Sequence, residues 1–176
     1  EDMPAEFLEG ASYLFIEGYL LSNESTFNLV LKAVAEAKSK GVSVALTCSD
    51  TFILEVFRNQ LEQILPYVDL LFANEVEALS LAKTDSFDEA FGALKQKFPI
   101  IAVTRGALGA VVAKDGEVFS ALAGKVNAVD STGAGDVFAG SFLEGMYRGL
   151  PMQVIADRSC ALASEVVAIS GPRLPD

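Results

Sequence analysis

The chain has 176 residues, which is long enough for one domain with a substantial hydrophobic core. Its 24 acidic and 13 basic residues give a formal net charge of −11, which argues against nucleic acid or an anionic membrane as a partner. It has no histidine, so catalysis by a Ser-His-Asp or Cys-His arrangement and histidine-ligated zinc are excluded within this chain.

Short apolar runs alternate with amphipathic segments along the chain. The first half predicts a strand at 11–16, a helix from Ser22 or Asn23 to Lys38, a strand at 42–47, a helix from Asp50 or Thr51 to about Leu65, a strand at 69–73 and a short helix at 74–81. The second half predicts a helix from Ser86 to about Lys97 with Glu89 as capping-box partner, a strand at 100–104, a hairpin of 110–113 with 118–122, and helices at about 134–149 and 151–169. This alternation is typical of a mostly parallel sheet covered on both faces, so the predicted fold class is three-layer α/β.

The cysteines and the N-terminal residues bear on the cellular location of the protein. Cys48 and Cys160 lie in apolar surroundings, and we expect both to be reduced core residues of a cytoplasmic protein. Residues 1–4 are acidic and lack the regions of a secretory signal peptide, and no apolar run is long enough to span a membrane. The chain does not begin with methionine and residues 11–16 resemble a strand from the middle of a domain, so we expect a truncated or processed chain.

The most informative feature is the run Asp130-Ser131-Thr132-Gly133-Ala134-Gly135-Asp136. Its two glycines form a turn that opens into an apolar helical run, and the carboxylate of Asp136 lies at the junction. The first N–H groups of a helix lack partners and bind anions, and a nearby carboxylate can take a proton from a hydroxyl. The run therefore suits phosphoryl transfer, in which positioning and charge stabilisation dominate. The alternative is an ordinary glycine-rich turn in which Asp136 caps the helix.

A second candidate site is Asn74-x-x-Glu77, where a predicted strand meets a helix. In parallel sheets, ligands bind at the carboxyl ends of the strands. Amide and carboxylate oxygens one helical turn apart there could order a hydrated Mg²⁺ and the phosphates that it binds. The alternative is structural, with Asn74 as helix N-cap and Glu77 as its capping-box partner.

A third candidate is Thr104-Arg105-Gly106-Ala107-Leu108-Gly109, which follows another strand. Gly106 and Gly109 would let the backbone approach a ligand closely, and Thr104 offers a hydroxyl at the strand end. An ordinary turn from a strand into a hairpin explains the same residues without a ligand.

Taken together and in this order, the three motifs resemble those of the ribokinase-like, PfkB-type family of carbohydrate and nucleoside kinases. The resemblance runs over essentially the whole chain, with Asp130–Asp136 as the specific signature and Ser131 where threonine is commoner. It implies a three-layer αβα sandwich and a reaction in which ATP phosphorylates a hydroxyl group. Asp136 would be the general base, and the N–H groups of Ala134, Gly135 and Asp136, following Gly133, would form the anion hole.

The resemblance also implies a set of cofactor sites. Thr104, Gly106 and Gly109 would border ATP, and Asn74 with Glu77 would organise Mg²⁺ through water. Asp130 and Thr132 match the family's monovalent-cation site, which is compatible with activation by K⁺. The segment Val167–Gly171 resembles the loop that completes that site, although Gly171-Pro172-Arg173 is an imperfect match.

Family members are much longer, so we expect residues 1–176 to be the C-terminal ATP-binding portion of such a kinase. The absent N-terminal segment would carry the lid and most contacts to the acceptor, and the sheet should lack strands on that side. We expect the fragment alone to be inactive.

Four hypotheses for the function remain open. Within the family, the stretches 15–20 and 49–52 together with Arg58 look most like adenosine-kinase-like members, so we expect the acceptor to be a sugar or ribonucleoside and favour one like adenosine. Alternatives are another acceptor such as ribose, fructose or keto-deoxygluconate, and a non-catalytic nucleotide-binding regulatory domain. A purely structural remnant would bind no ATP at all.

Overall fold

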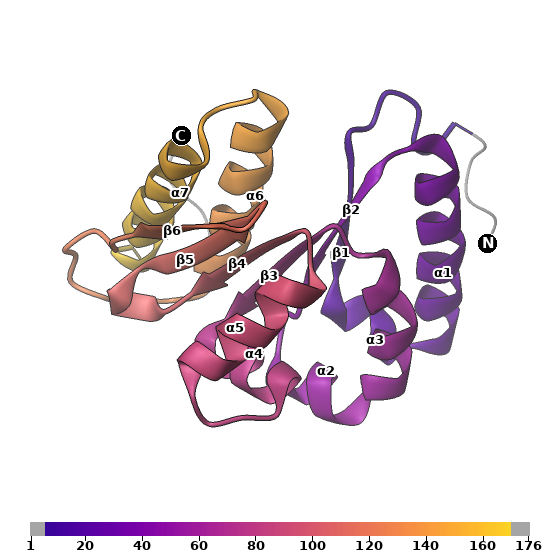
Figure 1. The fold of residues 1–176 in the computed structure, drawn as a ribbon, viewed down its shortest axis with the longest axis horizontal. Helices are drawn as coiled ribbons and strands as arrows, with labels where there is room; N and C mark the ends of the chain where they lie inside the picture. Colours follow the sequence, from indigo (N-terminus) through magenta and orange to yellow (C-terminus); the bar gives the residue numbers. More distant parts are fainter. Residues whose placement is uncertain (1–5, 170–176) are drawn as a thin grey trace. The chain divides into compact units, whose positions relative to one another are not determined.

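The structure, a computed structural model, describes residues 6–169 and has a three-layer α/β fold (Figure 1). Its strands are β1 (Tyr13–Glu17), β2 (Ser43–Thr47), β3 (Leu70–Asn74), β4 (Ile100–Thr104), β5 (Ala110–Lys114) and β6 (Glu117–Ala121). They form one sheet in the order β1-β2-β3-β4-β5-β6, parallel from β1 to β3 and antiparallel in the hairpin of β5 and β6. The predicted fold class is therefore confirmed, and β1 forms an edge of the sheet within the described residues.

The helices follow the strands nearly as predicted. They are α1 (Glu24–Lys40), α2 (Thr51–Val56), α3 (Arg58–Ile64), α4 (Glu75–Ala82), α5 (Phe87–Lys97), α6 (Ala134–Tyr147) and α7 (Met152–Val167), with 3₁₀ turns η1 (Gly18–Ser22), η2 (Leu65–Tyr67) and η3 (Gly106–Leu108). None of the helices among residues 6–169 has both the length and the apolar character needed to cross a membrane. The chain divides into two compact units, Glu1–Ile101 and Ala102–Asp176.

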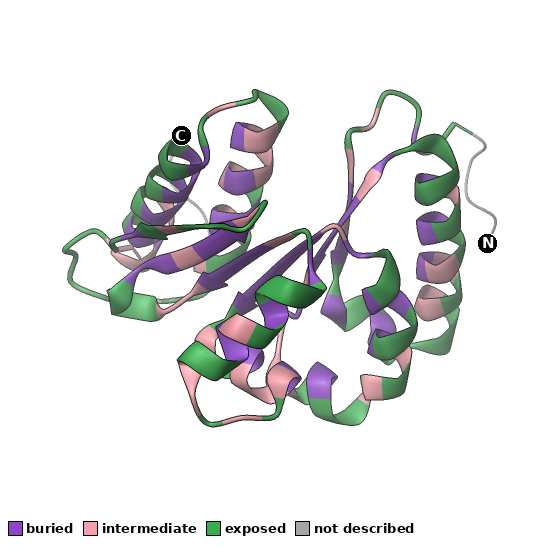
Figure 2. Ribbon diagram, viewed as in Figure 1, coloured by how far each residue is buried: buried purple, intermediate pink, exposed green. Residues whose placement is uncertain are grey.

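The first unit is built from β1, β2 and β3 with their connecting helices. β1 pairs with β2 in the register Phe15 to Ala45, and β2 pairs with β3 in the register Leu46 to Leu71. Helix α1 packs against β1 and β2, and α4 packs against β3. Figure 2 shows the buried side of these strands and helices in purple, where continuous Val, Leu and Ala residues exclude water.

Side-chain caps explain where most helices of this unit begin. Asn23 accepts hydrogen bonds from two N–H groups of α1, and Asp50 accepts one from Phe52 at the start of α2. At α5 the predicted capping box is only half formed, because Ser86 accepts from the N–H of Glu89 while the Glu89 carboxylate accepts from Thr84 Oγ1. The Thr84 hydroxyl also accepts from the N–H of Ser86. It therefore lies between the Ser86 N–H and the Glu89 carboxylate, which would bond directly to each other in a complete capping box.

The single helix predicted at 50–65 is wrong. The backbone leaves the helical region at Phe57, with φ −108° and ψ 28°, which divides the segment into α2 and α3. The Phe57 ring contacts the Phe52 ring edge to face, with 5.7 Å between ring centroids. The helical spacing of apolar residues does not reveal this break.

The second unit contains the hairpin and the last two helices. Asp115 and Gly116 both have positive φ, 52° and 83°, as the predicted two-residue turn requires. Helix α7 packs against β5, β6 and α6, and a side chain at Gly145 of α6 would come within 2.9 Å of Ile155 Cγ1 on α7. Pro151 precedes α7 as its N-cap residue rather than lying in its first turn.

Candidate functional site

The turn before α6 leaves backbone donors unpaired. Gly133 is the N-cap residue, in the left-handed conformation with φ 80°, and it has no side chain that could cap the helix. The N–H groups of Gly135 and Asp136 have no hydrogen-bond partner within residues 6–169. The N–H of Ala134 donates to Ser131 O over 3.3 Å, so the expected set of three free donors is reduced to two. Together with the helix dipole, the two remaining donors can bind an anion.

The carboxylate of Asp136 is exposed and unpaired. Asp136 is the third residue of α6, and no hydrogen bond or ion pair of its side chain is found in the described part of the chain. The alternative role as helix cap is therefore not what the structure shows, in contrast to Asp50, whose carboxylate accepts from the N–H of Phe52 at 2.8 Å. A free carboxylate beside open N–H groups can accept a proton from a hydroxyl close to a bound anion.

Asp130 organises the beginning of this turn. Its Oδ1 accepts a hydrogen bond of 2.9 Å from the N–H of Thr132, while the N–H groups of Val129 and Asp130 both donate to Val167 O, over 2.8 and 3.2 Å. The turn is thus tied to the end of α7, as the predicted cation site would need. Gly171, which the same prediction includes, lies outside the described residues, and the K⁺ site stays a prediction.

A cavity of about 360 Å³ lies beside the turn, wholly within the second unit. The predicted residues that line it are Thr104, Gly106, Gly109, Ala134 and Gly135. The structure therefore brings the third motif and the glycine-rich turn to one cavity, whose size is typical of small-molecule sites.

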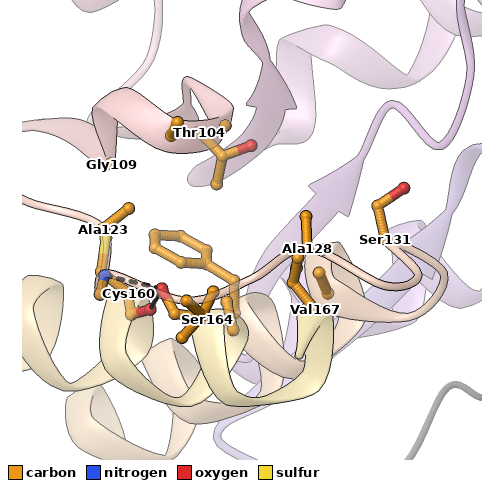
Figure 3. Close-up of a pocket in the computed structure, with 16 residues that line it drawn as sticks. Thr104, Gly109, Ala123, Ala128, Ser131, Cys160, Ser164 and Val167 are labelled. Carbon is orange, nitrogen blue, oxygen red and sulfur yellow. Dashed lines mark hydrogen bonds between the residues drawn. The ribbon is translucent and has the colours of Figure 1, made fainter. Parts of the chain in front are cut away.

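Four residues of α7, Cys160, Ala163, Ser164 and Val167, line the cavity, and the sequence did not predict that they border it. Figure 3 shows Cys160, Ser164 and Val167 along this helix, with Thr104 across the cavity. Ser164 Oγ accepts a hydrogen bond of 2.9 Å from the N–H of Gly124, which holds the segment after β6 against the cavity. The spacing of Cys160, Ser164 and Val167 matches one helix face, but the sequence does not show that this face borders a cavity rather than the core.

Gly109 meets a steric requirement of the fold besides its predicted place beside ATP. It has φ 91°, and a Cβ there would collide with Ala121 O and lie 2.8 Å from the N–H nitrogen of Ala123. The chain's own backbone therefore requires glycine at this position, which also lines the cavity. Gly106, with φ 54° and open space where a Cβ would be, is the glycine that can admit a ligand.

Asn74 and Glu77, in the first unit, form a complete capping box. Asn74 Oδ1 accepts from the N–H of Glu77 at 2.8 Å, and Glu77 Oε2 accepts from the N–H of Asn74 at 2.8 Å. Glu77 is only 5% exposed. Burial raises the pKa of its carboxyl group, the hydrogen bond from Asn74 lowers it, and the charge of Asp50 raises it.

The structural alternative for Asn74 and Glu77 is therefore realised, although one carboxylate oxygen stays available. Glu77 Oε1 has no hydrogen-bond partner among residues 6–169. No group of three or more potential metal ligands is found in that described part of the chain. The pair can therefore act on a metal only through water or together with other ligands.

Comparisons with known proteins support the fold and identify the family. The sequence matches the family described as pfkB family carbohydrate kinase over residues 1–176. Adenosine kinase from Schizosaccharomyces pombe is 29% identical over 97% of this chain and 54% of its own length. The chain spans about half the length of the relatives that it matches.

Solved structures show the same relationship. A probable sugar kinase from Rhizobium etli CFN 42 is 34% identical with a TM-score of 0.92, covering 98% of this chain and 53% of that one. Adenosine kinase from Sinorhizobium meliloti is 30% identical with a TM-score of 0.93, covering 98% and 54%. The fold is that of these kinases. The chain belongs to the pfkB family of carbohydrate kinases.

Proposed function

We propose that the full-length protein transfers the γ-phosphoryl group of ATP to a hydroxyl of a sugar or ribonucleoside, and that residues 1–176 are its C-terminal ATP-binding portion. One observation carries the proposal. Helix α6 begins without a side-chain cap, so two of its N–H groups are open beside the unpaired carboxylate of Asp136. By contrast, α1, α2 and α4 each follow an Asn or Asp whose side chain accepts a hydrogen bond from an N–H group in the first turn of the helix.

Each part of the turn has one role in the proposed reaction. Asp136 accepts the proton of the acceptor hydroxyl as the oxygen attacks the γ-phosphorus, and the bond from that phosphorus to the bridging oxygen of ADP breaks. The N–H groups of Gly135 and Asp136 stabilise the negative charge on the transferred group. The loss of one such donor typically lowers the rate by about 10²–10³.

The cofactors are ATP and Mg²⁺. The cavity bordered by Thr104 and Gly106 would hold the nucleotide next to the turn that binds its phosphates. Asn74 Oδ1 accepts from the N–H of Glu77 and Glu77 Oε2 accepts from the N–H of Asn74, so the remaining Glu77 Oε1 fits a water molecule of hydrated Mg²⁺ better than direct coordination. Bound Mg²⁺ would neutralise phosphate charge. K⁺ at Asp130 and Thr132 and a cytoplasmic location stay predictions.

Adenosine is the acceptor that we favour, because the matched relative from Schizosaccharomyces pombe is an adenosine kinase. The similarity to a probable sugar kinase keeps ribose, fructose and keto-deoxygluconate as alternatives. Since the chain spans about half of these relatives, we place most acceptor contacts in an N-terminal part of the full-length protein. Residues 1–176 by themselves should transfer no phosphate.

The test is phosphoryl transfer by the full-length protein with Mg-ATP and K⁺, using adenosine, ribose, fructose and keto-deoxygluconate. Asp136→Asn should lower turnover by at least about 10²-fold while ADP binding is kept. Asp88→Asn is the matched control, because Asp88 is also an exposed carboxylate in the first turn of a helix, α5. Full turnover by Asp136→Asn would refute the role of the base. Nucleotide binding without transfer to any acceptor would favour the regulatory alternative.

A further inference from the structure

The cavity beside α6 has few groups that could recognise a base by hydrogen bonding. Of the 16 residues that line it, twelve are Gly, Ala, Val or Phe, and none is charged or carries a side-chain amide (Figure 3). Within residues 6–169, the polar side-chain atoms at the cavity come from Thr104, Ser131, Cys160 and Ser164. Such a lining holds a flat aromatic base by apolar contact and the exclusion of water.

Two of these four polar side chains are already engaged. Ser164 Oγ accepts from the N–H of Gly124 at 2.9 Å and donates to Cys160 O at 2.8 Å. The Cys160 thiol is buried and lies 3.9 Å from Ala121 O. Burial raises its pKa to about 11, so it stays a neutral, weak hydrogen-bonding group. Neither side chain offers a strong free partner to a base.

The remaining two are hydroxyls, at Thr104 and Ser131. A hydroxyl can rotate to donate or to accept a hydrogen bond. Adenine presents an amino group where guanine presents a carbonyl oxygen, so a hydroxyl can satisfy either one. Discrimination between the two purines requires a group of fixed polarity, such as an amide or a carboxylate.

Several backbone groups at the cavity are also occupied. The N–H of Gly109 donates to Gly106 O over 3.0 Å, and Gly109 O accepts from the N–H of Arg105 at 2.7 Å. The N–H of Gly124 is held by Ser164 Oγ. These hydrogen bonds make the groups concerned unavailable for recognition of a base edge.

We infer that this site does not distinguish adenine from guanine, so that GTP serves as phosphoryl donor about as well as ATP. The inference rests on the proposed function and specifies which nucleotides serve as phosphoryl donor in it. A pocket that binds by apolar contact discriminates by about 10–200-fold at most, whereas a site built with fixed hydrogen-bond partners rejects the wrong ligand by about 10⁴–10⁵-fold.

The experiment compares Mg-ATP and Mg-GTP as donors for the full-length protein and measures kcat/KM for each. Calorimetric titration with ADP and GDP gives the two dissociation constants independently of turnover. We expect both ratios to lie within about tenfold. Ratios within about tenfold support the inference, and a larger preference for the adenine nucleotide overturns it.

The binding measurement separates this inference from the proposed function. If no acceptor is phosphorylated but ADP and GDP bind equally, the kinase proposal fails and with it the donor role of GTP, while the equal binding of the two bases stands. If ATP supports turnover and GTP does not, the kinase proposal stands and the inference is overturned. Thr104→Val removes one hydroxyl at nearly constant volume and should leave the ratio of ADP to GDP affinity unchanged within about threefold. A larger change in this ratio would show that Thr104 discriminates between adenine and guanine, and it would overturn the inference.

Discussion

The Ser164 hydroxyl accepts a hydrogen bond of 2.9 Å from the N–H of Gly124, which lies 40 residues earlier in the chain. A side chain at Gly124 would come within 3.1 Å of Ser164 Cβ, so the backbone of this segment lies directly on α7. Since Gly124 and Ser164 both line the cavity, this hydrogen bond sets the distance between two of its walls.

Ser164→Ala should loosen the segment around Gly124 and weaken nucleotide binding. The loss of one partly buried hydrogen bond lowers the free energy of unfolding by about 0.5–1.5 kcal/mol. In the variant, the segment around Gly124 becomes ordered only when ADP binds. A free-energy cost of about 1 kcal/mol for this ordering raises the dissociation constant for ADP about fivefold. Urea denaturation and calorimetric titration of the full-length protein measure both effects.

The matched control is Ser159→Ala on the same helix. Ser159 is fully buried, and its Oγ has no hydrogen-bond partner in the described part of the chain. Its removal should leave both stability and ADP affinity unchanged or slightly improved, because no hydrogen bond is lost. Equal effects of the two alanine variants would show that the Gly124–Ser164 hydrogen bond does not shape the cavity.

Gly135→Ala should make the protein more stable and less active. Gly135 is in α6 with open space around the position of a Cβ, so alanine should raise the free energy of unfolding by up to about 1 kcal/mol. It also lines the cavity beside the open N–H groups, where a methyl group would displace the transferred phosphate. Turnover should therefore fall by about 10²-fold.

Gly140→Ala provides the comparison for that variant. Gly140 is also in α6, exposed, with nothing within 4 Å of a Cβ, and it does not line the cavity. It should give a similar gain in stability with unchanged turnover. Thermal unfolding and the transfer assay on both variants decide whether glycine is needed at 135 for the reaction or only tolerated by the helix.

Glu77→Gln should raise the Mg²⁺ requirement without unfolding the protein. Glutamine can complete the capping box with Asn74, so the start of α4 is kept. The negative charge that would orient hydrated Mg²⁺ is lost, and half-maximal activation should need about 10–100-fold more Mg²⁺. Glu89→Gln changes the carboxylate at the same helical position of α5 and should leave Mg²⁺ dependence unaltered. A normal Mg²⁺ response in Glu77→Gln would leave the pair with a structural role alone.

Glu77 also makes stability depend on pH. Burial, together with the charge of Asp50, raises the pKa of its carboxyl group in the folded state despite the hydrogen bond from Asn74. The folded state then holds the proton more tightly than the unfolded state does. The free energy of unfolding should fall as the pH rises from the ordinary glutamate range through the raised pKa.

The measurement is urea denaturation of wild type and Glu77→Gln at a series of pH values from acid to neutral. The variant lacks this titration, so its stability relative to wild type should increase with pH across that window and then become constant. A relative gain by wild type with rising pH would contradict the raised pKa.

Local features of the fold were predictable because they depend on neighbours in sequence. Asn23 and Asn74 cap the helices that follow them, and Asp115-Gly116 turns the hairpin, because these residue types suit those backbone positions wherever they occur. The break at Phe57 was not predictable, since the helical spacing of buried apolar residues continues from α2 into α3.

The candidate site divides in the same way. The sequence by itself determined the open turn at Gly133, the position of Asp136 in the first turn of α6, and the family to which these motifs point, because all depend on a short continuous run. Only the tertiary structure decided that Ser164 holds Gly124 and that Cys160 lines the cavity. Those contacts join residues far apart in the chain, and they depend on the rotation of α7 about its axis and on the path of the segment after β6. Neither is encoded in a local pattern, so the polarity of the cavity was visible only once the chain was folded.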